Sequence, residues 1–512
     1  MRARIVAALG CCLALAQVAP AAAAESGAAA AKPEAEISLH PVRGQGEQVT
    51  AIEVSSVYRG ELGGAADAFH LKAPIVYAGR TGMADAVHEL VVQDADGRVP
   101  LGIADDPADP GGFPYYRHWR AERPVVAPVT VSYRVTPAAQ PLRGPQFDFY
   151  AHGGGVSSGG MALFVLPQGL DASWRVRWDL DDLAPGAFAA STHGEGALEL
   201  EGPGDRLVQA YYMAGPLGRF AAEDTNSSFH AYWLGRTRFD APAEMAWTAE
   251  AYAYLRRFFR DDTTPAYRVF VRAVPAEQGL GGTALGNSFM VGVPEGDPEP
   301  GAQAPRGTLF HEMGHLFVGG LAGEPPGGAA WFAEGLNVHY TRLLLLRSGL
   351  APVDDYLDSI NSSARNYYSS PYRSASADEL FRLGFSTGIG AGSAQNIAYT
   401  RGSLYFAAAD ARIRAASGGR RTLDDVILPL FEARRNGEAL TREILLDALA
   451  AAAGESERTA FTEGIVDGAL VVPPSEAFGP CFERQPATYD DGTEGYEWVR
   501  VESVADEECR RW

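Results

Sequence analysis

Two histidines and a glutamate in the stretch "TLFHEMGHLF" (308–317) have a spacing that suits metal chemistry. On a helix, residues i and i+4 share a face, so His311 and His315 can present their imidazoles to one ion while Glu312 leans toward the same region. Zinc prefers such nitrogen ligands, and a catalytic zinc takes three protein ligands and a water molecule. The motif alone leaves open a pair of ordinary helical histidines, so a third ligand decides its meaning.

The third ligand is expected in the stretch "WFAEGLNVHY", which contains Glu334. Eighteen residues separate it from His315, and among them "VGGLAGEPPGGA" is rich in glycine and proline. Such a segment can reverse the chain, so that a second helix returns beside the first. Glu324 and His339 are alternative third ligands, although a site completed by His339 gives Glu334 no role. We predict one Zn²⁺ ion held by His311, His315 and Glu334.

The elements that position these groups follow from the periodicity of the apolar residues. From residue 37 to about 204, short alternating runs such as "QVTAIEVSSVYRG" and "PVTVSYRVTP" are broken by Gly, Pro and Asp, which is typical of an antiparallel β-sandwich. The run "AHGGGVSSGG" (151–160) predicts a flexible glycine loop. Further along, strands are expected at 267–274 and 287–294, and helices at 242–262, 306–320, 330–348, 401–417, 422–435 and 441–452.

Taken together, "HEMGH", eighteen residues, and the glutamate of "WFAEG" followed by Tyr340 resemble the gluzincin metallopeptidases. Within them the chain is most similar to the glycyl aminopeptidase family, distant relatives of aminopeptidase N. The stretch "AYTRGSLYFAAADARIRAASGGRRTLDDV" (398–426) resembles the helix and the L-D-D turn that follow in that family. The resemblance covers about 205–450 well and the N-terminal sandwich more loosely. It implies a thermolysin-like, mainly helical zinc peptidase domain.

The family places a tyrosine hydroxyl near the zinc, and the matching residue here is Tyr399 in "YTRG". A tetrahedral oxyanion that forms at a zinc-polarised carbonyl needs a second donor in a dry site, and a phenol can supply one at neutral pH. The alternative for Tyr399 is a half-buried packing residue at the start of a helix. Tyr405, six residues later on the same helix, lies off that face and is expected in the core.

The stretch "GLGGTALGNSFMV" (279–291) departs from the family pattern. In the family, a glycine-rich edge strand before the zinc helix carries a glutamate that binds the free α-amine of the substrate. Gly281, Gly282 and Ser288 fit that pattern, but the acid position holds Ala284, or Gly286 in another register.

No carboxylate stands between Glu277 and Glu295. An amine-binding subsite without its counter-charge would be costly to occupy, so the aminopeptidase activity is not expected. The strand can still pair with an extended peptide through main-chain hydrogen bonds, which favours an endopeptidase. Substrate binding is therefore predicted at Gly281, Gly282, Ala284 and Ser288.

The C-terminal segment, 473–512, is a second departure, because family members often end in a PDZ domain and these residues are too few for one. It contains Cys481 and Cys509, the two cysteines that remain after export. A disulfide between them is the natural interpretation for an exported protein, and two separate buried thiols are the alternative.

The N-terminus resembles an export signal. Arg2 and Arg4 form a basic region, "IVAALGCCLALAQVA" is apolar, and "PAAAA" supplies small residues for cleavage. We assign 1–24 to the signal peptide and 25–36 to a low-complexity linker. A lipid attached to Cys11 is less favoured, because "ALG" before it is a poor lipobox. The composition is typical of bacteria, so a periplasmic or secreted protein is expected.

Charge and hydropathy exclude several classes of partner. The formal net charge of −21 argues against nucleic acids and anionic membrane surfaces. No segment after the signal reaches the ~20 apolar residues that span a bilayer. The motif "GFSTG" (384–388) matches a serine-hydrolase turn, but no histidine follows it in the chain.

The sequence therefore predicts an α+β multidomain protein with a β-sandwich at 37–204 and a catalytic domain at 205–472. Its expected function is that of an exported zinc metallopeptidase that hydrolyses peptides or proteins through a zinc-activated water. Glu312 takes a proton from that water and delivers it to the leaving amine. The alternatives are an aminopeptidase with a non-standard amine anchor and a zinc-stabilised binding scaffold with little turnover.

Overall fold

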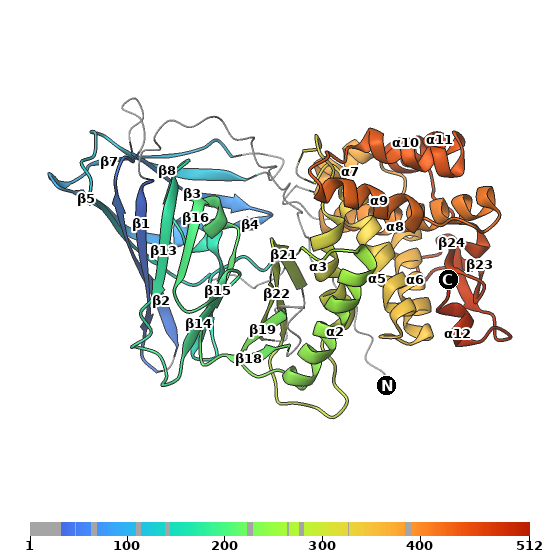
Figure 1. The fold of residues 1–512 in the computed structure, drawn as a ribbon, viewed down its shortest axis with the longest axis horizontal. Coiled ribbons are helices and arrows are strands. Elements are labelled where there is room, and N and C mark those ends of the chain that lie inside the picture. Colours follow the sequence, from blue (N-terminus) through green and yellow to red (C-terminus); the bar gives the residue numbers. More distant parts are fainter. Residues whose placement is uncertain are drawn as a thin grey trace. The chain divides into compact units, whose positions relative to one another are not determined.

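The computed structural model describes residues 32–46, 48–62, 69–108, 114–138, 144–222, 229–263, 266–275, 281–325, 327–384 and 391–512. The predicted signal peptide, residues 25–31 of the linker and residues 385–388 of "GFSTG" lie outside this set. The protein is a mixed α/β molecule with several β-sheets and many helices (Figure 1). None of the described helices has the length and hydrophobicity needed to cross a membrane.

The described residues form two compact units. Unit 1 contains residues 32–249 and 266–305, and unit 2 contains residues 250–263 and 306–512. The chain passes from one unit to the other within α2 (Ala241–Phe259). The predicted catalytic domain, 205–472, includes residues of both units, and its boundaries stay a prediction.

Unit 1 is built from β-sheets, and several strands of its largest sheet alternate buried and exposed residues. In β2 (Val49–Arg59) and β9 (Val129–Val135), for example, β-branched and aromatic side chains alternate with polar ones, as a half-buried pleated surface requires. The largest sheet has the order β16 (Leu198–Pro203), β13 (Asp171–Trp178), β1 (Glu34–Arg43), β2 (Val49–Arg59), β9 (Val129–Val135), β5 (Val87–Asp94), β6 (Gly97–Arg98).

Two further sheets complete the N-terminal part of unit 1. One has the order β10 (Tyr150–His152), β11 (Gly155–Gly159), β17 (Tyr211–Gly215), β14 (Phe188–Ser191), β15 (Gly194–Glu195). The other has the order β12 (Leu166–Pro167), β3 (His70–Tyr77), β8 (Tyr115–Ala121), β7 (Leu101–Asp105), with β4 (Arg80–Thr81) paired to β3.

Two expectations for this region were wrong. The large sheet is not wholly antiparallel, because β1 and β13 run parallel, with Glu34 opposite Ser173. The long connection through β2 to β12 allows this, since parallel neighbours need a crossover. The run 151–160 is not a flexible loop but the hairpin β10–β11, turned at Gly153 (φ +54°) and Gly154 (φ +75°). Two positive φ angles favour glycine at both turn positions.

The last sheet of unit 1 has the order β18 (Gly218–Ala221), β19 (Phe229–Leu234), β20 (Tyr267–Val274), β22 (Ser288–Pro294), β21 (Gly281–Leu285). The strands predicted at 267–274 and 287–294 are β20 and β22. The edge strand β21 pairs with β22 as a hairpin around Gly286 and Asn287. Gly281, Gly282 and Ala284 lie on β21, and Ser288 begins β22.

Unit 2 is mainly helical (Figure 1). The helix predicted at 330–348 is two helices that meet at Glu334, and the helix predicted at 401–417 starts earlier, at Ala391. The helices are α3 (Arg306–Val318), α4 (Ala330–Ala333), α5 (Gly335–Ser348), α6 (Val353–Tyr368), α7 (Ala377–Gly384), α8 (Ala391–Ser417), α9 (Asp424–Arg435), α10 (Arg442–Ala453) and α11 (Ser456–Phe461).

The C-terminal segment folds onto this helical unit. It contains the hairpin β23 (Phe482–Thr488) and β24 (Glu494–Arg500), followed by α12 (Asp506–Cys509). The predicted disulfide Cys481–Cys509 is confirmed, with the two Cα atoms 5.6 Å apart. Asn361 of α6 exchanges two hydrogen bonds of 2.8 Å with the backbone of Trp498, which fixes β24 against that helix.

Candidate metal centre

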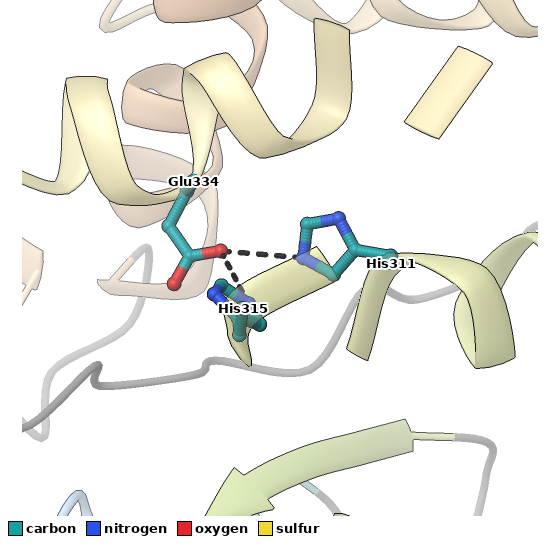
Figure 2. Close-up of side chains that lie close together, drawn as sticks. All are labelled: His311, His315 and Glu334. Atoms are coloured by element: carbon teal, nitrogen blue, oxygen red, sulfur yellow. Dashed lines mark ion pairs between the residues drawn. The ribbon is translucent and has the colours of Figure 1, made fainter. Parts of the chain in front are cut away.

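His311 and His315 lie one turn apart on α3, and both imidazoles point toward the carboxylate of Glu334 (Figure 2). The Nε2 atom of each histidine is 3.3 Å from Oε2 of Glu334. One ligand atom from each of the three side chains lies within 4.8 Å of the others. Three potential ligands from two separate segments thus converge on one point.

Two close helix contacts produce this convergence. Gly314 of α3 faces Asn337 of α5 so tightly that a Cβ at Gly314 would lie 2.0 Å from Oδ1 of Asn337. The side-chain amide of Asn337 donates a 2.8 Å hydrogen bond to the carbonyl of His311. This bond fixes the register of the two helices, so that Glu334 arrives opposite the histidines.

The break between α4 and α5 has a similar cause. A Cβ at Gly335 would lie 2.5 Å from the Cα of Gly402 on α8, so the two backbones approach as only glycines allow. Glu334 stands at this junction, directly before Gly335. The contact therefore brings α8, which carries Tyr399, close to the segment that carries Glu334.

The atoms of the cluster are buried, and apart from the 3.3 Å ion pairs within the cluster they have no hydrogen-bond partner among the described residues. His311, His315 and Glu334 are 2%, 8% and 2% exposed. Within the described part of the chain, neither ring nitrogen of either histidine and neither oxygen of Glu334 has a hydrogen-bond partner. Buried polar atoms in proteins are normally hydrogen-bonded, so open atoms in this number indicate a missing ligand. Two imidazoles and one carboxylate are a donor set that fits catalytic zinc.

The electrostatics agree with that interpretation. Burial by itself would lower the pKa of His315 and raise that of Glu334. The attraction between them outweighs burial, so the pKa of His315 is raised and the pKa of Glu334 is lowered. The pocket therefore holds positive charge beside this carboxylate, and a divalent cation would compete with the proton for the site.

Glu312 and Tyr399 lie beside this cluster. Glu312 is 1% exposed and adds to the attraction that Glu334 exerts on a protonated His315. The ring of Tyr399 is buried and stacks on the ring of His311, with the centroids 6.2 Å apart and the planes at 27°. Unit 2 by itself thus brings together the predicted ligands, the predicted base and the predicted oxyanion donor.

The alternative third ligands lie elsewhere. Glu324 pairs with Arg442 at 2.8 Å. His339 is buried outside the cluster, where burial and then Arg342 lower its pKa to about 3. Tyr405 is buried, as expected, and its hydroxyl donates a 2.8 Å hydrogen bond to Glu457.

The predicted substrate-binding residues lie in unit 1. Ser288 is fully buried, where its hydroxyl donates to the carbonyl of Leu285 and lies 2.7 Å from the hydroxyl of Thr192. These contacts hold the turn of the β21–β22 hairpin. Ala284 is half-buried on the edge strand, and no acid occupies its position.

A pocket beside Glu334 was missed by sequence reasoning. Its walls come from α4, α7, the first turns of α8 and Ile465. The strongly amphipathic stretch "ADELFRLG" was the available signal for α7, since its apolar positions recur at helical spacing. The lining residues are Gly327, Gly328, Ala330, Trp331, Glu334, Ala377, Leu380, Phe381, Gly384, Ala394, Gln395, Ala398, Tyr399, Arg401 and Ile465.

No family model matches the chain, and no curated protein is similar to it in sequence. Solved structures do share its fold. An aminopeptidase N family protein from Idiomarina loihiensis is 16% identical, with a TM-score of 0.73 over 90% of this chain and 81% of that chain. An M1 zinc metallopeptidase from Deinococcus radiodurans is 16% identical, with a TM-score of 0.52 over 86% of this chain and 96% of that chain.

A variant of the Deinococcus radiodurans enzyme bound to the substrate Tyr-Ser-Ala is 15% identical, with a TM-score of 0.51 over 87% of this chain and 95% of that chain. At these identities the likeness shows the fold, which is that of multidomain M1 zinc metallopeptidases.

Proposed function

We propose that the protein is a zinc metallopeptidase that hydrolyses peptide bonds, with His311, His315 and Glu334 holding one zinc ion. The observation that carries this proposal is the convergence of three buried side chains whose polar atoms have no hydrogen-bond partner among the described residues. The fold supports it, since the structures that share it include M1 zinc metallopeptidases.

In this proposal Glu312, Tyr399 and Asn337 each have a defined role. A bound zinc would polarise the substrate carbonyl and lower the pKa of water. The carboxylate of Glu312 accepts the proton of the attacking water and returns it to the leaving nitrogen. The hydroxyl of Tyr399 donates to the oxyanion as it forms, and burial of the site strengthens that hydrogen bond. Asn337 holds α3 in register, so that His311 and Glu312 keep their orientation.

We further propose that the enzyme cleaves within peptides rather than at a free N-terminus. Ala284 replaces the acid that would bind an α-amine, and among the residues that line the pocket Glu334 is the only carboxylate. An unpaired ammonium in such a site would be costly, whereas a blocked or internal residue carries no charge there. Gly281, Gly282, Ala284 and Ser288 then belong to a strand that aligns the extended substrate.

Export is part of the proposal. Residues 1–24 would direct the chain to the periplasm or the medium, and the disulfide Cys481–Cys509 supports an oxidising compartment. The −21 charge suits a protein that binds neither nucleic acid nor anionic membranes.

The test is hydrolysis of a mixed library of N-blocked and free peptides by purified protein, with and without a chelator, and after zinc is restored. We expect blocked peptides to be cut, chelator to stop the reaction, and zinc to restore it. Cleavage of free peptides alone would establish an aminopeptidase with a non-standard anchor. Bound zinc without turnover would establish a binding scaffold, and absence of any loadable metal would refute the proposal.

A further inference from the structure

The pocket beside Glu334 is mostly apolar, and it lies wholly within unit 2. Trp331, Leu380 and Ile465, which are 6%, 9% and 2% exposed, contribute large apolar walls. Glu334 and Tyr399 are lining residues too. The pocket therefore opens directly at the groups to which the proposal above assigns zinc and the oxyanion.

Small side chains in the pocket wall leave room for a ligand. Ala330, Ala377 and Ala398 line it, and each side chain ends at Cβ. Ala398 precedes Tyr399 on α8 and is half-buried, so a larger side chain at this position would enter the pocket. A pocket of this kind suits one apolar side chain of a ligand.

A buried positive charge stands in the wall. Arg401 is 1% exposed, and its guanidinium donates 2.8 Å hydrogen bonds to the carbonyls of Arg373 and Ala375. Its Nε has no partner, and in the described part of the chain no carboxylate pairs with it. Burial lowers the pKa of Arg401 and outweighs the opposite effect of the neighbouring phenol of Tyr367.

The other charge of the wall does not offset Arg401. Glu334 is the only carboxylate among the lining residues, and it forms ion pairs with the two imidazoles at 3.3 Å. A second cation placed in the pocket would meet an unneutralised guanidinium without bulk water between them.

Resting on the peptidase function above, we propose that this pocket receives the substrate side chain next to the scissile bond. It selects uncharged apolar side chains, and Arg401 makes it reject lysine and arginine. Ala398 sets the size of the side chain, and Arg401 sets its charge. Both act as specificity-determining residues, since neither takes part in proton transfer.

The test is a series of N-blocked peptides that differ only at one residue beside the scissile bond, which is Ala, Leu, Phe, Glu or Lys. A hydrophobic pocket discriminates by roughly 10–200-fold per missing group. We expect kcat/KM for the Leu and Phe peptides to exceed that for the Ala peptide by at least ~10-fold, with the Lys peptide cut most slowly. Equal rates for Leu and Lys would overturn the proposal.

Ala398→Phe fills the pocket, and Ala416→Phe is its matched control, because Ala416 is exposed on the same helix and does not line the pocket. Ala398→Phe should reduce the ratio of kcat/KM for the Leu peptide to kcat/KM for the Ala peptide to about 1, whatever happens to the absolute rates. Ala416→Phe should keep the ratio of the native chain. An unchanged ratio in Ala398→Phe would refute the role of this pocket.

Arg401→Met removes the charge, and Arg401→Lys keeps it. In the Met variant, kcat/KM for the Lys peptide should rise relative to that for the Leu peptide by roughly 10-fold. In the Lys variant this ratio should not change. Since Arg401 also binds two carbonyls, thermal unfolding is measured in parallel, and the Ala398→Phe ratio decides if neither variant folds.

A binding measurement separates this inference from the peptidase proposal. The Glu312→Gln variant, which should bind peptide without cutting it, is titrated calorimetrically with the blocked Leu and Lys peptides. If no peptide is hydrolysed by the native chain, the peptidase proposal fails, and tighter binding of the Leu peptide still supports the pocket. Hydrolysis with equal binding of both peptides refutes the pocket alone.

Discussion

Unit 2 contains two polar clusters, each built around a buried carboxylate, that are opposite in hydrogen bonding. In the first, the carboxylate of Glu457 is fully buried and accepts hydrogen bonds from the hydroxyl of Tyr405 and from the guanidinium of Arg412, both at 2.8 Å. In the second, His311, His315 and Glu334 are also buried, but apart from the ion pairs among themselves their polar atoms have no hydrogen-bond partner in the described part of the chain.

The difference shows how a structural cluster and a ligand site can be told apart. The Glu457 cluster satisfies its own charges, so nothing further is needed for its stability. The Glu334 cluster leaves desolvated atoms open, which is costly unless an external ligand completes them. Substitutions in the first cluster should therefore affect stability, and those in the second should affect metal binding and turnover.

The largest effect is expected from Glu312→Gln, beside the open cluster. General acid–base catalysis contributes about 10²–10⁴-fold, so kcat should fall by that factor or more. The zinc content should stay the same, since the three ligands are untouched. Steady-state kinetics and elemental analysis of the same preparation measure both quantities, and unchanged turnover would remove Glu312 from its role.

A paired substitution of the two carboxylates tests the comparison directly. Removing one partner of a buried charged pair costs about 3–5 kcal/mol, and Arg412 is 33% exposed, so Glu457→Gln should lose about 3 kcal/mol of unfolding free energy. It should retain zinc. Glu334→Gln should lose zinc. Urea unfolding measures the stability of each variant, and elemental analysis measures its zinc content. Zinc loss in Glu457→Gln would contradict the assignment of Glu457 to a structural cluster.

Two tyrosines on α8 give the next contrast. Tyr399→Phe removes the hydroxyl proposed for the oxyanion and should lower kcat by about 10²–10³-fold with a native unfolding midpoint. Tyr405→Phe deletes a donor to buried Glu457 and should cost about 1–3 kcal/mol of stability with native kcat. Equal losses of activity in both variants would show that Tyr399 acts only through packing.

The sequence was sufficient for those features that depend on local pattern. The convergence of His311, His315 and Glu334 followed from their spacing, and β20 followed from its short apolar run. The disulfide followed from the number and place of the cysteines. Each of these rests on residue type and short-range periodicity, which can be read without knowing the fold.

The features that were missed depend on contacts between distant residues. The break at Glu334 arises where Gly335 meets Gly402, and no local signal marks that contact. The parallel pairing of β1 with β13 likewise depends on the whole intervening chain. The pocket combines side chains of α4, α7 and α8, so its charge and size appear only once those helices pack.

His339 offers the smallest expected effect and a third kind of buried group, because it belongs to neither cluster. Its pKa of about 3 in the folded protein results first from burial and then from Arg342. In the unfolded chain a histidine has its ordinary pKa of about 6.5. Between these values the unfolded state binds a proton that the folded state does not, so stability falls as the pH falls from about 6.5 toward about 3.

At pH 5 this term amounts to about 2 kcal/mol, since one pKa unit corresponds to about 1.4 kcal/mol. His339→Asn should therefore lose less stability than the native chain between pH 7.5 and pH 5, by about that amount, as measured by urea unfolding of the metal-free protein at the two pH values. His152 of unit 1, whose pKa is also lowered to about 3 by burial, supplies the matched control. Replacing His152 should reduce the loss of unfolding free energy between pH 7.5 and pH 5 by an equal amount. If neither variant changes this loss, both histidines become protonated without unfolding.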